Sequence, residues 1–285
     1  MPARPLPRPA TAAVAPMPLS CTLSTVLGPE ESVPGRPGPA AGAAQVAYLE
    51  AALADAAAGR IAGLCTAPIH KASAKAAGLR FPGHTELLAE RLAAGPGPVV
   101  MMLAGPSLRV ALVTTHIALA AVPAALTVDG ICGVLRTTAL ALHHDFGIAA
   151  PRLWVAGLNP HAGEAGHFGD EEPRLIAPAL AAARALPDLA ALPGLELRGP
   201  EVPDAVFRAA VHPPDGVRPD AVVAMYHDQG LIPLKLLDFD DGVNVTLGLR
   251  VPRTSPDHGV AHDIAGQGRA RTGSMAAALR LCQEL

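Results

Sequence analysis

The sequence predicts an α/β protein with helices packed on both faces of a mostly parallel sheet. Short apolar runs alternate along the chain with longer segments whose apolar residues recur at helical spacing. The apolar runs end in Gly, Pro or polar loops, as the buried strands of such a sheet do. Half of the 285 residues are hydrophobic, so the chain can bury a core of the size that this architecture needs.

From residue 41 onward the alternation can be followed element by element. Helical spacing over residues 41–59 stops at Gly59, and the apolar run 61–68 that follows ends at Pro68. Further helices are expected at residues 84–94, 128–146 and about 175–186. Further strands are expected at residues 99–104, 108–115, 152–158, 195–199, 220–226 and 242–249.

Residues 1–40 have a different composition. Ten of the chain's 30 prolines fall here, and proline removes a backbone donor and breaks helices. We therefore predict a poorly ordered leader over residues 1–40, followed by an α/β region over residues 41–285.

The charge and composition of the chain exclude several classes of function. The 22 basic and 25 acidic residues give a net charge of −3 without a basic stripe, so neither nucleic acid nor an anionic membrane is an expected partner. The apolar runs are shorter than the roughly 18–20 residues of a membrane helix, and prolines interrupt the apolar N-terminus. The four cysteines lie far apart, as in proteins of a reducing compartment, so a cytoplasmic location is expected.

Four of the predicted strands are followed by a histidine in a polar loop: His70, His116, His161 and His227. Open α/β sheets bind ligands at the carboxyl ends of their strands. Three imidazoles from separate strand ends suit a catalytic divalent metal with an open position, although one such histidine alone is more often a satisfied polar side chain. The other histidines lack this placement and are interpreted as surface residues: His143, His144, His167, His212 and His262.

Charged and polar residues near these histidines have two readings each. Asp228 follows His227 and either orients an imidazole or is a surface carboxylate. His84 and Thr85 precede an apolar-periodic helix, where they mark either a phosphate site or a plain Thr N-cap. Residues 170–172 are acidic and form either an ordinary acidic loop or the first turn of a helix. Lys235 has a leucine on each side, which indicates a shielded cation for an anionic substrate.

Common nucleotide and nucleophile motifs are missing from the sequence. It contains neither G-x-G-x-x-G nor G-x-x-x-x-G-K-[ST], and neither G-x-S-x-G nor H-E-x-x-H. A dinucleotide, if one is used, binds without the usual Rossmann fingerprint.

Several longer blocks resemble one family closely. TAPIHK, GHTELLAE, TTHIAL, GLNPHAGEAGHFGDEE, AMYHDQGLIPLK, VNVTLGL and RTSPDHGVAHDIAGQGRA occur in the order found in the 4-hydroxythreonine-4-phosphate dehydrogenases of pyridoxal phosphate biosynthesis. The resemblance runs from about Pro34 to near the C-terminus. It implies a fold similar to isocitrate and isopropylmalate dehydrogenases, with residues 41–285 forming two interleaved subdomains of an obligate homodimer.

The resemblance also implies a set of site residues. The metal ligands fall on His116, His161 and His227, with one contributed by the neighbouring subunit. The substrate-binding residues are His84, Thr85, Lys235, Asn244 and Arg253. The catalytic acids and bases are Lys235, Asp228 and Asp204, the last after a stretched spacing. His258, Gly259 and Asp263 lie in a segment similar to the adenosine-binding loop of isopropylmalate dehydrogenases.

The implied reaction is the NAD- or NADP-linked oxidation of 4-phosphohydroxy-L-threonine, assisted by a divalent ion such as Zn, Mg, Mn or Co. The resulting β-keto acid decarboxylates to 3-amino-2-oxopropyl phosphate. Alternatives are a paralogous dehydrogenase of a phosphorylated four-carbon sugar acid or of an aromatic cis-dihydrodiol. A metal-dependent hydrolase also suits three histidines with nearby carboxylates.

The N-terminus departs from the family pattern. Family members begin with a strand and a glycine-rich G-[DE]-P-A-G-I-G-P-E block, whereas this sequence joins the pattern near PGRPGPAAG. This predicts either a longer protein with an earlier start or a truncated, inactive homologue.

Overall fold

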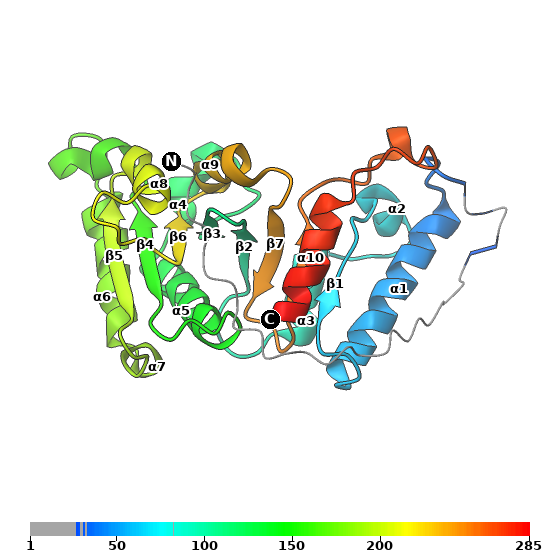
Figure 1. Cartoon of the computed structure of the whole chain (residues 1–285), viewed down its shortest axis with the longest axis horizontal. Helices are drawn as coiled ribbons and strands as arrows, with labels where there is room; N and C mark the ends of the chain where they lie inside the picture. Colours follow the sequence, from blue (N-terminus) through cyan, green and yellow to red (C-terminus); the bar gives the residue numbers. More distant parts are fainter. Residues whose placement is uncertain (1–26, 29–30, 32, 82) are drawn as a thin grey trace.

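The structure is a computed structural model that describes residues 27–28, 31, 33–81 and 83–285 (Figure 1). Most of the leader predicted to be poorly ordered, residues 1–40, therefore lies outside the described residues. The first helix begins at Pro39, two residues earlier than expected. Proline is tolerated there because the first helical position has no intrahelical use for its amide hydrogen.

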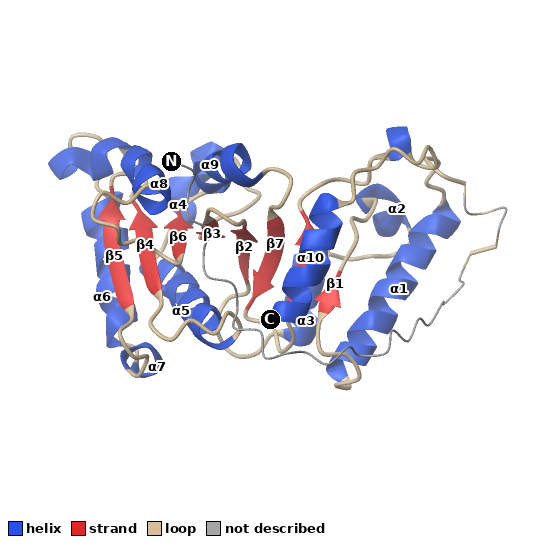
Figure 2. Cartoon of the chain, viewed as in Figure 1, coloured by secondary structure: helices blue, strands red, loops and turns tan. Residues whose placement is uncertain are grey.

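The described strands form one eight-stranded sheet in the order β1-β8-β7-β2-β3-β6-β4-β5. They are β1 (Leu64–Cys65), β2 (Val100–Ala104), β3 (Arg109–Leu112), β4 (Arg152–Ala156), β5 (Glu196–Glu201), β6 (Ala221–Ala224), β7 (Val243–Leu247) and β8 (Arg253–Pro256). Neighbours pair in parallel at β1/β8, β3/β6, β6/β4 and β4/β5, and antiparallel at β2/β3, β2/β7 and β7/β8. The predicted α/β class is confirmed, with a mixed sheet (Figure 2).

Ten α-helices surround this sheet in the described part of the chain. They are α1 (Pro39–Ala57), α2 (Lys71–Ala76), α3 (His84–Leu92), α4 (Val122–Ala125), α5 (Val128–His144), α6 (Ala177–Ala185), α7 (Pro187–Ala190), α8 (Pro203–Val211), α9 (His227–Asp238) and α10 (Gly273–Glu284). Short 3-10 or π segments cover Leu119–Ala121, Pro160–Gly166, Glu172–Ile176 and His262–Ile264.

The core consists of two apolar clusters on opposite faces of the sheet and a third beside it. Successive residues of β2 show the division, because Met102 packs in the cluster with α5 and α6, while Leu103 packs in the cluster with α8 and α9. Burial on both faces explains the continuous apolar runs of the central strands. The third cluster joins α1, α3 and β1, on the right in Figure 1.

The last part of the chain returns to the first. β8 pairs with β1, and α10 packs against β8 and runs beside β1 in Figure 1. The division of residues 41–285 into two interleaved subdomains stays a prediction. Among the described residues no single helix is long and apolar enough to cross a membrane; one pair bent by 93°, Leu119–Ala125 with Val128–His144, reaches that length and apolarity only together.

Candidate active site

A cleft of about 740 Å³ brings together residues from distant parts of the sequence. All five predicted substrate-binding residues line it: His84, Thr85, Lys235, Asn244 and Arg253. They come from α3, α9, β7 and β8. Other lining residues include Lys71, His116 and Asp257.

Arg253 is the most unusual of these side chains because it is a buried cation, 3% exposed, without a carboxylate partner among the described residues. Its guanidinium donates to the hydroxyls of Thr246 (2.9 Å) and Thr66 (2.7 Å). Its Nε is buried and has no hydrogen-bond partner. Burial lowers the pKa of Arg253 to about 10. A buried, partly unsatisfied guanidinium on the wall of a cleft is suited to an anionic ligand.

His84 and Thr85 are the first two residues of α3, and Gly83 is the N-cap without a side-chain capping bond. The alternative that Thr85 is the N-cap is therefore wrong, and the first amide groups of α3 stay available at the cleft. Burial, and then the positive charges of Arg253 and Lys71, lower the pKa of His84 to about 4. The imidazole is neutral at physiological pH and offers one donor and one acceptor.

Lys235 is held by an ion pair that the sequence did not predict. Its Nζ lies 2.9 Å from Oδ2 of Asp257, the residue that follows β8. The side chain of Lys235 is 40% exposed and that of Asp257 is 22% exposed. The position of Asp257 in the TSPDHG block was the available signal, although only the pairing of β8 with β7 places it beside α9.

His116 and His227 meet at the carboxyl ends of two neighbouring parallel strands, β3 and β6. Their ring centroids are 5.4 Å apart. His227 Nδ1 lies 2.7 Å from Oδ1 of Asp228, so this carboxylate is in position to orient the ring. Partial burial, and then His227 and Lys71, lower the pKa of His116. Both rings therefore meet at one site with a carboxylate behind one of them.

His161 follows β4, whose parallel pairing with β6 places it at the same edge of the sheet. Its ring contacts Phe168, with 5.9 Å between centroids. In the described part of the chain, no three His, Cys, Asp or Glu residues form a group able to hold a metal. His70 does not line the cleft, although Ile69 and Lys71 on either side of it do. Its ring bonds Ser73 and packs against His262.

The segment that carries His161 has an unusual backbone. Residues 161–165 all have positive φ angles, from 39° to 81°, and only one of them, Gly163, is a glycine. Left-handed conformation costs about 1 kcal/mol or more per non-glycine residue. Surrounding contacts must hold this turn in place.

Glu172 supplies several of those contacts from a site that is 2% exposed. Its Oε1 accepts from the backbone amides of Leu158 and Asn159 at 2.8 and 2.7 Å, and its Oε2 accepts from Asn159 Nδ2. A Cβ on Gly163 would lie 2.8 Å from Oε2, so the turn packs directly on this carboxylate. The prediction that residues 170–172 only begin a helix missed this role, because it depends on the return of the loop to the end of β4.

Replacing Glu172 by alanine is expected to lower the free energy of unfolding by about 3 kcal/mol, since buried donors lose their acceptor. Urea unfolding measures this change. Asp170→Ala is the control, because the side chain of Asp170 is 66% exposed and its pairing with Arg174 is worth under about 1 kcal/mol. Equal losses in the two variants would contradict the structural role of Glu172.

Asp204 is exposed in the first turn of α8, and α8 contacts the Pro160–Gly166 segment. It does not line the cleft. α8 places Asp204 beside the His161 turn rather than beside Lys235. Its catalytic role stays a prediction.

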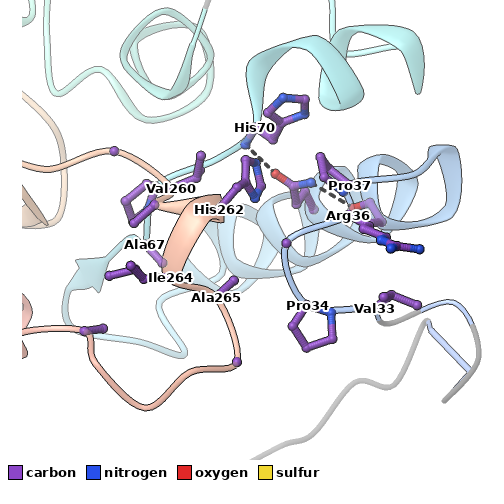
Figure 3. A pocket seen from close by; sticks show the side chains of 18 of the residues that line it. Val33, Pro34, Arg36, Pro37, Ala67, His70, Val260, His262, Ile264 and Ala265 are labelled. Carbon is purple, nitrogen blue, oxygen red and sulfur yellow. Dashed lines mark hydrogen bonds between the residues drawn. The ribbon is translucent and has the colours of Figure 1, made fainter.

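A second cavity of about 550 Å³ adjoins the cleft, and Ala67, Pro68, His258 and Gly259 line both (Figure 3). Figure 3 shows His70 and His262 on one side of it and Pro34 on the other. His258 and Gly259 thus lie between two cavities, and their role in cofactor binding stays a prediction. Asp263 does not line the cavity, whereas His262, interpreted from sequence as a surface residue, does, with a buried Nε2 that has no partner.

Comparisons with known proteins identify relatives over most of the chain. The family model described as pyridoxal phosphate biosynthetic protein PdxA matches residues 9–282. This match begins earlier than Pro34, where the resemblance in the sequence was seen to begin. A 4-hydroxythreonine-4-phosphate dehydrogenase from Caulobacter vibrioides is 50% identical over 256 residues, which cover 88% of this chain and 73% of the relative. The corresponding enzyme from Desulfosudis oleivorans is 52% identical over 86% of this chain and 69% of its own length.

Solved structures of similar proteins superpose on this chain over most of its length. The 4-hydroxythreonine-4-phosphate dehydrogenase from Klebsiella pneumoniae is 44% identical, covers 90% of this chain and 73% of its own, and superposes with a TM-score of 0.78. A terephthalate 1,2-cis-dihydrodiol dehydrogenase from Burkholderia xenovorans is 32% identical over 91% of this chain and 78% of its own, with a TM-score of 0.65. The chain therefore belongs to the PdxA family of pyridoxal phosphate biosynthetic proteins.

Proposed function

We propose that this chain is a 4-hydroxythreonine-4-phosphate dehydrogenase. Its reaction is the metal-dependent, NAD(P)-linked oxidation of 4-phosphohydroxy-L-threonine to a β-keto acid, which decarboxylates to 3-amino-2-oxopropyl phosphate. The observation that supports this most is the cleft in which buried, partly unsatisfied Arg253 meets the other four predicted substrate residues. The relatives of known name support the same activity.

We assign different roles to the cleft residues according to their charge and their hydrogen-bonding groups. Arg253 and the start of α3 bind anionic groups of the substrate. Neutral His84 exchanges hydrogen bonds without adding charge. Lys235, oriented by Asp257, is the group able to move a proton at the reacting carbons.

The metal site that we propose uses His116 and His227 of one subunit. The two neighbouring imidazoles, with Asp228 behind one of them, fit the donor set of a Zn, Mn or Co ion, whereas Mg prefers oxygen ligands. His161 of a second copy is proposed as a third ligand. A bound ion would stabilise negative charge on the substrate hydroxyl oxygen, and a bound nicotinamide would supply the hydride acceptor.

The cofactor is proposed to lie across the two adjoining cavities. Its nicotinamide enters the cleft, and its adenosine part, as NAD or NADP, enters the second cavity beside His258 and Gly259. The second cavity is mostly apolar and has two imidazole rings on its wall, which suits a planar base.

A homodimer is proposed because α9 carries an exposed apolar stripe next to His227. Ile232, Leu236 and Phe239 recur at helical spacing and are 59%, 82% and 66% exposed. Leu119, 69% exposed, lines a pocket together with His116 and His227. Such a surface beside an incomplete metal site is expected to meet a second copy. Leu236→Glu should convert the dimer to a monomer in analytical ultracentrifugation, whereas Leu279→Glu, at a 50% exposed position on α10, should not.

The activity is tested by incubating the purified protein with Zn²⁺, Mn²⁺ or Mg²⁺, NAD⁺ or NADP⁺, and 4-phosphohydroxy-L-threonine. Reduction of the cofactor, followed at 340 nm, is the expected result. If the enzyme turns over only a phosphorylated four-carbon sugar acid or a cis-dihydrodiol, that compound is its substrate instead of 4-phosphohydroxy-L-threonine. A folded dimer with metal-dependent hydrolysis and no measurable affinity for NAD(P) would instead be a hydrolase.

A cytoplasmic location is part of the proposal and is consistent with free Cys65, Cys132 and Cys282.

A further inference from the structure

Lys71 is the second cation of the cleft without a carboxylate partner. It begins α2, directly after the loop that follows β1, and lines the cleft with Arg253 and His84. Among the described residues, no carboxylate oxygen lies within 4.0 Å of its Nζ. The chain contains only three lysines, and of the other two, Lys235 pairs with Asp257 and Lys75 lies outside the cleft.

The side chain of Lys71 reaches the N-terminus of α3. A Cβ built on Gly83, the N-cap of α3, would lie 3.8 Å from Cε and 4.0 Å from Nζ of Lys71. Glu86 Oε2 approaches the same point at 3.4 Å, but forms no ion pair with Lys71. The ammonium group therefore lies beside the N-cap residue of α3.

The charges around this point are complementary to an anion. Lys71 and Arg253 both act on His84, which stays neutral between them. Arg253 is only 3% exposed, and its Nε has no hydrogen-bond partner among the described residues. Two cations and a helix N-terminus therefore converge in the cleft. Glu86 and Asp257 also line it, but neither forms an ion pair with Lys71 or Arg253.

We propose that Lys71 binds the phosphoryl group of the substrate together with Arg253 and the first turn of α3, and that it sets the preference for a phosphate monoester. This inference rests on the proposed function. A phosphate monoester carries a charge of about −1.5 to −2 at neutral pH, which one guanidinium does not neutralise. Arg253 supplies a fixed fork of donors, and Lys71 supplies a compact charge on a flexible chain.

The test compares Lys71→Met with Lys75→Met, a matched lysine one turn further along α2. Inorganic phosphate is the probe, and its affinity is measured by isothermal titration calorimetry without cofactor or metal. We expect Lys71→Met to weaken phosphate binding by about tenfold to a hundredfold, as loss of one charge-assisted contact does. Lys75→Met should bind phosphate like the unmodified protein. With the full substrate, Lys71→Met should raise KM by a similar factor and change kcat by less than about threefold.

Unchanged phosphate affinity in folded Lys71→Met would overturn the inference, even if the enzyme oxidises 4-phosphohydroxy-L-threonine. Weakened phosphate binding in an enzyme without that activity would support the inference and reject the proposed function. If Lys71→Met does not fold, reductive ¹³C-methylation of the three lysines provides a second measurement on the unmodified sequence. Addition of phosphate should then shift the Lys71 resonance, assigned with Lys71→Arg, and leave that of Lys75 in place; the reverse pattern would also overturn it.

Discussion

Replacing Arg253 by methionine is expected to lower kcat/KM by a hundredfold to ten thousandfold and to raise the stability of the free protein at the same time. The loss of activity follows from two charge-assisted hydrogen bonds to the substrate anion, each worth about 1.5–3 kcal/mol. Steady-state kinetics with the phosphorylated substrate measure this effect. The change should appear mainly in KM if the contacts are equally strong in the ground state and the transition state.

The gain in stability follows from the burial of Arg253. Burial lowers the pKa of its guanidinium from 12.5 to about 10, which corresponds to roughly 3 kcal/mol against the charged form in the folded state. Methionine removes this penalty but leaves the hydroxyls of Thr66 and Thr246 without a donor, at about 1 kcal/mol each. A net gain of about 1 kcal/mol, or roughly 2–3 °C in Tm, is expected.

Arg250→Met is the matched control for both measurements. Arg250 is three positions away, is exposed, and donates only to the carbonyl oxygen of Ala93. Its replacement should change stability by less than about 0.5 kcal/mol and leave kinetics unchanged. A destabilised Arg253→Met that keeps full activity would show that Arg253 is a structural residue rather than an anion receptor.

The five substrate residues that the family resemblance implies line one cleft, although the sequence does not predict all the elements that carry them. Asn244 and Arg253 were placed in one site, yet β8 and its antiparallel pairing with β7 were not foreseen. The short run 253–256 has no periodic pattern. The sequence does not predict α9 either, because Pro233 lies inside this helix and proline is typical of a helix end. The resemblance therefore located side chains whose backbone context depends on long-range pairing.

The errors have the same origin. His70 looked equivalent to His116 because each follows an apolar run, but the ring of His70 bonds Ser73 and packs against His262, which is far away in sequence. Glu172 does lie in the first turn of a helix, but its hydrogen bonds to the residues after β4 were not predicted, because those residues are distant in sequence. Lys71 had no distinguishing local pattern at all. Residues whose role depends on a contact between two distant segments are the ones that pattern and spacing miss.

Replacing His227 by alanine is expected to reduce affinity for a divalent ion by at least about a thousandfold, and Asp228→Asn to reduce it by about tenfold to a hundredfold. Asp228 is expected to act through His227, because its Oδ1 lies 2.7 Å from Nδ1 and so leaves Nε2 as the coordinating nitrogen. Competition with a chromogenic chelator measures both affinities without any substrate or cofactor.

Asp228→Asn should leave the fold intact, because the side chain of Asp228 is 71% exposed. Its free energy of unfolding should therefore stay within about 0.5 kcal/mol of the unmodified protein. Asp241→Asn, an exposed carboxylate just beyond α9, serves as the control and should change neither quantity. An asparagine accepts a hydrogen bond from Nδ1 but carries no charge, so a loss of affinity in Asp228→Asn alone would identify the carboxylate charge as what makes His227 a strong ligand. Equal metal affinity in the unmodified protein, Asp228→Asn and Asp241→Asn would instead mean that the 2.7 Å contact between Asp228 and His227 has no part in metal binding.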